Sequence, residues 1–258
     1  MRQLAITLTA ALMCGTCALA QNRVKNVYTE SKSLNVEQVI NTEQATQLNR
    51  YLIAGYNTLC LPMSLTAEQL TAYGITAERF TAVSQEGNTV QLYFVDCTAE
   101  GIEAGVPYLI YSPKTQYLRV KNTESGRTAT ELKTIRLADN QGNQVAFSSS
   151  WDQKNKEGHY GIPAKQDVTP LESVLVRTTA DLAFLPTRCG FSWEQQSPTA
   201  EKLEIRHAQA SEVTAISQTR IDDATEQEAY DLSGRKLNVP GKGINIINGK
   251  KVVSVSRD

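Results

Sequence analysis

The sequence predicts a mostly β protein: an antiparallel β-sandwich with one short helix, followed by a small C-terminal β-meander. Two observations indicate this fold. Apolar and polar residues alternate in many short segments, as with Val90, Leu92 and Phe94. Gly, Pro and Asn separate these segments at short intervals, which is typical of sandwiches. Because the chain has 258 residues, it is long enough for one sizeable core.

The predicted strands lie on both sides of a single helix. Residues 21–45 are polar and weakly patterned, so we expect a short leading strand or a loosely held arm there. The two strands before the helix are 46–53 and 56–62. Those after it are 89–97, 106–111, 117–121, 131–137, 144–147, 160–164, 171–178 and 190–193.

The helix is predicted from signals at both of its ends. Thr66 can cap its start, and Gln69 three residues later completes a capping box. Leu70 and Tyr73 would then face inward. Gly74 is suited to end the helix in the left-handed conformation.

The first twenty residues have the order of a secretory signal peptide. Arg2 precedes a mostly apolar run from Leu4 to Leu19, and Ala18-Leu19-Ala20 provides small residues for cleavage before Gln21. The run is too short and too rich in Thr and Gly for a good membrane span. We therefore expect an exported protein that does not span the membrane, at the cell surface or outside the cell, with the periplasm as the alternative.

The charge of the chain argues against nucleic acid as a partner, and its cysteine content limits the possible disulfides. With 26 basic and 27 acidic residues, the chain lacks the basic excess of nucleic-acid-binding proteins. Cleavage at Gln21 would leave Cys60, Cys97 and Cys189 in a compartment that permits disulfides. Three cysteines allow at most one intramolecular pair, and buried free thiols are an equally good interpretation.

The C-terminal segment 229–258 alternates strand and turn residues. Asn248-Gly249 suits a two-residue hairpin turn. The segment resembles the C-terminal tails of proteins exported by Gram-negative anaerobes of the gut and mouth, a short relative of the type IX secretion sorting domain. The residues that carry the resemblance are Tyr230, Asp231, Leu232, Ser233, Gly234, Arg235, Lys242, Gly243, Ile244, Asn248, Gly249, Lys250, Lys251, Val252 and Val253.

This resemblance implies a partner in the export or anchoring machinery. The alternative is a small accessory β-module with no sorting role. A thin row of apolar residues in so short a segment needs a partner surface to hold it. We therefore predict four parts: a signal peptide over 1–20, a sandwich domain over 21–205, a flexible linker over 206–228 and the tail over 229–258.

A second resemblance covers roughly residues 44–193. A Gly-aromatic-Asn-Thr-Leu-Cys-Leu-Pro strand stands at 55–62, a short helix at 66–73 and a Gly-x-Pro-Tyr-Leu-Ile strand at 105–110. This order resembles a recurrent module in surface-exported proteins of the same bacteria. The resemblance implies an architecture and no activity.

Candidate functional residues are few. Trp151, Tyr160 and Trp193 lie in turn-rich segments, where aromatic rings can bind a glycan or a protein; packing in the core is the alternative for each. A thiol nucleophile would need one of the cysteines beside His159 or His207, and no protease motif accompanies them. After residue 20, no metal-binding spacing such as His-x-x-x-His or Cys-x-x-Cys is present, and no cofactor is predicted.

These observations predict an exported, non-enzymatic surface or secreted protein with a binding or adhesion role and an unknown ligand. The alternative is a secreted glycan-degrading hydrolase. Its carboxylate pair would come from Asp152, Glu157, Asp167 or Glu172.

Overall fold

The computed structural model describes residues 24–163, 175–214 and 216, and five short strand segments, 219–220, 229–230, 236–237, 243–247 and 250–254. The predicted signal peptide therefore lies outside the described residues. Within them, the mostly β, sandwich-like fold is confirmed.

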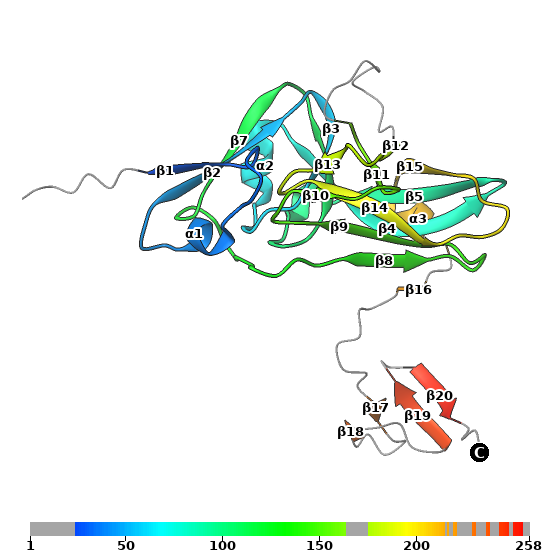
Figure 1. Ribbon diagram of the computed structural model, residues 1–258. Helices are drawn as coiled ribbons and strands as arrows, with labels where there is room; N and C mark the ends of the chain where they lie inside the picture. Colours follow the sequence, from blue (N-terminus) through cyan, green and yellow to red (C-terminus); the bar gives the residue numbers. More distant parts are fainter. Residues whose placement is uncertain are drawn as a thin grey trace, which may run out of the picture.

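Two large sheets form the main sandwich (Figure 1). The five-stranded sheet has the order β15 (Lys202–Ala208), β5 (Thr89–Asp96), β4 (Thr76–Glu86), β6 (Tyr108–Ser112), β3 (Gly55–Leu59). The six-stranded sheet has the order β12 (Val176–Arg177), β11 (Tyr160–Gly161), β14 (Cys189–Gln195), β9 (Gln144–Ser149), β8 (Ile135–Ala138), β16 (Thr219–Arg220).

A core of aromatic side chains joins these sheets. Phe80 and Phe94 come from one sheet, and Phe147 and Phe191 from the other. Each is at most 2% exposed. Residues two apart in a strand face the same way, so burying the phenylalanine-bearing face of each sheet produces the sandwich.

A three-stranded sheet and two helices enclose a second core. The sheet has the order β1 (Lys25–Tyr28), β2 (Thr46–Leu52), β7 (Gln116–Lys121). Helices α1 (Val36–Ile40) and α2 (Ala67–Tyr73) contribute Val36, Val39 and Leu70 to this core. The 3₁₀ turn η1 (Thr98–Glu100) and a small two-stranded sheet, β10 (Lys154–Asn155) with β13 (Ala183–Phe184), complete the domain.

The predicted helix is confirmed as α2. Thr66 accepts a hydrogen bond from the Gln69 amide, and the Gln69 side chain accepts one from the Thr66 amide, forming the expected capping box. Gly74 ends the helix with a φ of 66°. A side chain at this φ would be strained, so glycine is favoured there.

Other local predictions were wrong. The prediction of one helix missed α1 and α3 (Ala210–Val213). For residues 21–45, by contrast, the expected short leading strand is confirmed as β1, which pairs with β2, whereas α1, with Val36 and Val39 buried, was not predicted. The missed strand β15 runs to Ala208, so the boundary at residue 205 falls within a strand of the main sheet. The sandwich was predicted to be antiparallel, but two strand pairs, β1 with β2 and β15 with β5, are parallel.

The described part of the C-terminal segment forms a sheet of its own, β18 (Lys236–Leu237), β17 (Ala229–Tyr230), β19 (Gly243–Ile247), β20 (Lys250–Ser254), in that order. β17 lies between β18 and β19, so the order differs from a simple meander. Ile247 pairs with Lys250 as the predicted hairpin requires. Tyr230, Gly243 and Lys250 lie in these strands, whereas Asp231, Leu232, Gly234, Arg235, Asn248 and Gly249 lie outside the described residues.

Candidate functional site

The three aromatic residues proposed from the sequence occupy two places. Trp151 is partly buried against both cores, and its indole Nε1 donates to the Thr130 carbonyl at 2.7 Å. Trp193 and Tyr160 pack together with their ring centroids 6.4 Å apart. The Trp193 Nε1 donates to Asn143 Oδ1 at 3.3 Å. All three side chains therefore have packing or hydrogen-bond partners in the fold, and binding by them stays a prediction.

A different aromatic cluster is more exposed. Tyr28, Tyr51 and Tyr117 lie on the outer face of the three-stranded sheet, and we call this surface the tyrosine face. Tyr28 is 50% and Tyr51 is 37% exposed. The Tyr117 ring centroid lies 6.0 Å from that of Tyr28 and 5.2 Å from that of Tyr51. Such rings offer large, rigid contact areas at low entropic cost.

Strand pairing explains why the tyrosines meet. Tyr51 in β2 stands directly opposite Tyr117 in β7. Tyr28 in β1 stands opposite Asn49, which shares a face with Tyr51 because residues two apart in a strand point the same way. The opposite face carries Leu48, Leu52 and other residues of the core.

Amide side chains lie beside the tyrosines. The Gln47 Nε2 donates to Asn26 Oδ1 at 3.1 Å and to Asn49 Oδ1 at 2.9 Å. The Asn49 amide donates to Asn26 Oδ1 and to the Val27 carbonyl, both at 3.2 Å. These bonds hold the three amides in fixed orientations. Within the described residues, the Asn26 amide nitrogen and the Gln47 Oε1 make no hydrogen bond, which leaves a donor and an acceptor for a ligand.

A cation completes the tyrosine face. The exposed Arg119 guanidinium carbon lies 6.0 Å from the Tyr117 ring centroid. Glu30 accepts a hydrogen bond from the Tyr51 amide at 3.0 Å. The face thus combines exposed rings, oriented amides and one carboxylate and one guanidinium group.

Sequence patterns predicted only part of the tyrosine face. Tyr51 and Tyr117 fell in predicted strands, but nothing in the local pattern pairs those two strands with each other. Tyr28 belonged to the segment for which a short leading strand or a loosely held arm was expected. The alternation of Asn26 and Tyr28 with buried-side Val27 was the available signal for β1, although it covers only four residues.

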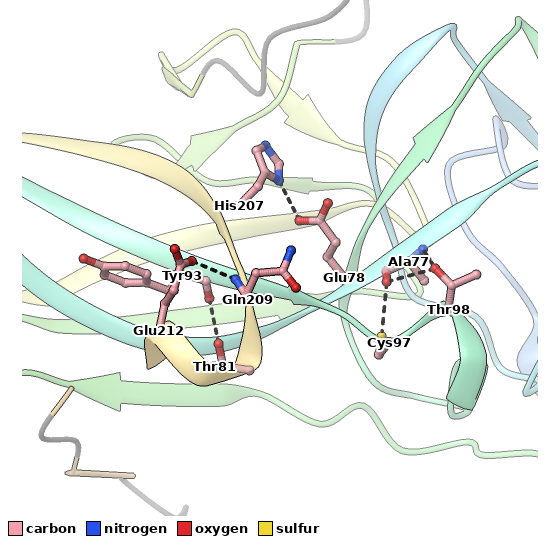
Figure 2. Close-up of polar contacts among 9 residues, drawn as sticks. All are labelled: Ala77, Glu78, Thr81, Tyr93, Cys97, Thr98, His207, Gln209 and Glu212. Atoms are coloured by element: carbon pink, nitrogen blue, oxygen red, sulfur yellow. Dashed lines mark hydrogen bonds and ion pairs between the residues drawn. The ribbon is translucent and has the colours of Figure 1, made fainter. Parts of the chain in front are cut away.

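The thiols are not placed as nucleophiles. Figure 2 shows the Cys97 sulfur directed at the Ala77 carbonyl, at 3.4 Å, whereas His207 Nδ1 lies 2.6 Å from Glu78 Oε2. Burial raises the pKa of Cys97 and of Cys189 to about 12, and that of Cys60 well above its ordinary value. A thiol with so high a pKa is protonated near neutral pH, and the thiolate is the reactive form.

The cysteines are also unpaired. Cys60, Cys97 and Cys189 are buried free thiols, in agreement with the alternative to a disulfide. Cys60 and Cys189 belong to the same core. Their role here is that of small apolar residues.

Of the four carboxylates named for the hydrolase alternative, two lie among the described residues. Asp152 is exposed and accepts a hydrogen bond from Ser33 Oγ at 2.6 Å, and Glu157 is exposed as well. Asp167 and Glu172 lie outside the described residues. No group of three or more potential metal ligands occurs among the described residues.

An apolar hollow lies elsewhere, beside β11 and β12 of the six-stranded sheet. Its volume is about 370 Å³, within the range of small-molecule sites. Exposed Val176 and Leu182 lie at it, together with Phe184 and Arg188. It adjoins Pro163, where the described chain is interrupted, so we base no function on it.

In the described part of the chain, no helix has the length and apolar character needed to cross a membrane.

Comparison with known proteins identifies no relative of this chain. No protein-family model, no curated protein and no solved structure matches this chain.

Proposed function

We propose that this protein is an exported, non-catalytic binding protein whose tyrosine face binds a polysaccharide at the cell surface or outside the cell. The cluster formed by the exposed Tyr28 and Tyr51 and the partly buried Tyr117 carries the proposal. A sugar ring has an apolar C–H surface that packs against aromatic rings, and hydroxyl groups at its edge that exchange hydrogen bonds with amides.

The neighbouring polar groups favour a sugar over a purely apolar partner. The Asn26 amide nitrogen and the Gln47 Oε1 supply a donor and an acceptor next to the rings, and both residues are held by their mutual hydrogen bond. A preorganised site loses little side-chain entropy when a ligand binds. The face lies on a sheet, so an extended chain of sugars could contact all three rings.

Affinity electrophoresis of residues 21–258 in gels containing a soluble β-glucan, xylan or mannan tests the binding. We expect at least one polysaccharide to retard the protein. The variants Tyr28→Ala and Tyr117→Ala should weaken binding at least tenfold, or by about 1.4 kcal/mol. Tyr28→Phe and Tyr117→Phe, which keep the rings, should retain most of it.

Tyr160→Ala is the matched control, because Tyr160 is a partly buried tyrosine next to Trp193. If Tyr160→Ala abolishes binding and the Tyr28 and Tyr117 variants do not, the site belongs to the Tyr160–Trp193 pair. If no polysaccharide retards the protein and size-exclusion chromatography shows a dimer that Tyr28→Ala dissociates, the face binds a second copy of the chain instead.

The export part of the proposal rests on the two ends of the chain, 1–20 and 229–258. In the native host, deletion of residues 229–258 should leave a folded protein in the periplasm. Grafting residues 206–258 onto a passenger protein should carry it to the surface. If the truncated protein reaches the surface as well as the full chain does, the tail is an accessory β-module.

A further inference from the structure

The side chains of β7 extend the tyrosine face beyond its rings. Tyr117, Arg119 and Lys121 alternate with buried residues of the core, so all three point to the outer side of the sheet. Successive members of this row are about 7 Å apart. This spacing is comparable with the length of one sugar unit. A positive charge therefore lies beside the ring against which we expect a sugar to pack.

The two cations of this row differ in their partners. Lys121 Nζ lies 2.7 Å from Glu124 Oε1 and forms an ion pair with it. The Arg119 guanidinium group is exposed, and within the described residues it forms no hydrogen bond or ion pair. Its N–H groups are therefore open to a ligand, whereas a carboxylate already compensates the charge of Lys121.

Two contacts hold Arg119 in place. The Tyr73 hydroxyl, at the end of α2, accepts a hydrogen bond from the Arg119 amide at 3.2 Å and donates one to the Arg119 carbonyl at 2.9 Å. These bonds close the outer edge of β7 at this residue. The guanidinium carbon lies 6.0 Å from the Tyr117 ring centroid, within the range of a cation–π interaction. A residue held in this way loses less entropy when it binds a ligand.

A second arginine lies behind the face. Arg50 is in β2 between Asn49 and Tyr51 but points to the opposite side of the sheet, and it is only 1% exposed. Burial lowers its pKa to about 9, so the group still carries its charge at neutral pH. Glu30 raises this pKa through its negative charge and offsets part of the positive charge. Glu30 itself is engaged with the Tyr51 amide, at 3.0 Å.

The chemistry of a guanidinium group favours one class of sugar. Its planar N–H groups match the two oxygens of a carboxylate. A uronic acid carries a carboxylate directly on its sugar ring, so the charge lies beside the surface that packs on an aromatic side chain. A neutral sugar offers only hydroxyl groups. With 26 basic and 27 acidic residues, the chain has no general attraction for polyanions, and binding of an acidic polymer requires a local site.

We propose that the tyrosine face is specific for an acidic polysaccharide, and that Arg119 binds the carboxylate of a uronic acid unit whose ring packs on Tyr117. This inference rests on the proposed function and names the class of its ligand. Arg119 is then the residue that determines specificity: the rings bind sugars in general, and the guanidinium group distinguishes an acidic unit from a neutral one.

An oligogalacturonate and its fully methyl-esterified form provide the test, because they share one sugar backbone and differ in the charge of the carboxyl groups. Isothermal titration calorimetry of residues 21–258 measures both affinities. The acid should bind roughly fivefold more tightly than the ester, as for one exposed ion pair of good geometry. High salt should reduce this preference, because salt screens exposed charges. Equal affinities at low salt would overturn the inference.

Substitution of Arg119 should remove the preference for the acid. Arg119→Gln should lower the affinity for the acid to that for the ester and leave the affinity for the ester unchanged. Arg119→Lys, which keeps the charge but not the planar N–H groups, should retain part of the preference. Arg206→Gln is the matched control: the Arg206 guanidinium carbon also lies near a tyrosine ring, 5.5 Å from that of Tyr93, but it is paired with Glu86.

A charge-matched control lies on the face itself. Lys121→Gln removes the same charge as Arg119→Gln, but from a cation that already has a carboxylate partner. It should leave most of the preference for the acid intact. An equal loss in both variants would mean that the general charge of the face, and not a contact with Arg119, selects the acid, which would overturn the inference.

Failure of the inference and failure of the proposed function give different results. If Arg119→Gln changes neither affinity while Tyr28→Ala and Tyr117→Ala weaken both, the face binds polysaccharide without selecting acidic units. If Tyr28→Ala and Tyr117→Ala leave both affinities unchanged, the rings do not bind the sugar, and the proposed function fails together with the inference.

Discussion

The phenylalanine core and the tyrosine face are two aromatic clusters built in the same way but used differently. In the core, Phe147 stands opposite Phe191 on neighbouring strands, with ring centroids 4.3 Å apart. On the face, Tyr51 stands opposite Tyr117 at 5.2 Å. Cross-strand pairing brings the rings together in both places.

The clusters differ in what covers them. The second sheet closes over the phenylalanines, whereas no described element covers Tyr28 and Tyr51. Burial turns aromatic area into folding free energy, while exposed area remains available for a ligand. The comparison therefore predicts that truncating a ring of the phenylalanine core lowers stability, whereas truncating a ring of the tyrosine face weakens ligand binding.

Truncation in the core should have the largest effect on stability. Phe94 is fully buried and contacts Phe80, Phe147 and Phe191. Phe94→Ala should lower the free energy of unfolding by about 3–5 kcal/mol, because it removes apolar contacts and leaves a cavity. Tyr28→Ala, on the surface, should change it by about 0.5 kcal/mol or less. Urea unfolding measures both, and equal losses would refute the distinction between the clusters.

The pH dependence of stability compares the two cores directly. Cys97 belongs to the core under the tyrosine face and Cys189 to the phenylalanine core, and burial raises the pKa of each from 9.0 to about 12. Above about pH 9 the unfolded chain releases protons that the folded chain retains. Each thiol should therefore lower the free energy of unfolding by about 1.4 kcal/mol per pH unit.

Urea unfolding from about pH 8 to about pH 10.5 checks this, with Cys97→Ala and Cys189→Ala compared with the unmodified protein. In each variant, the free energy of unfolding should fall less steeply with pH, by the contribution of the one thiol that was removed. A variant that keeps the full slope would mean that water reaches the thiol in that core.

Removing a ring from the tyrosine face should have the smallest effect on stability. Tyr51→Ala loses the cross-strand contact with Tyr117 and should cost about 0.5–1 kcal/mol. Tyr51→Phe should be within about 0.5 kcal/mol of the unmodified protein, because the ring remains. Urea unfolding distinguishes the two; a loss above that of Phe94→Ala would place Tyr51 among the residues that hold the fold together.

Local chemistry determined a large part of the fold. The Thr66–Gln69 capping box and Gly74 defined α2, since these signals act within one turn of the chain. Period-two alternation located β5 and β7, because each strand has one buried face. The missed β15 is a parallel edge strand, and its pairing with β5 is a contact between distant segments.

Only the tertiary structure decided the candidate sites. The tyrosine face requires β1, β2 and β7 to be neighbours, although β2 and β7 are far apart in the chain. The buried charge of Arg50 arises because alternation turns it inward between Asn49 and Tyr51. A sequence specifies which residues alternate, but the strand neighbours and the packing of sheets determine which face is covered and which is open to a ligand.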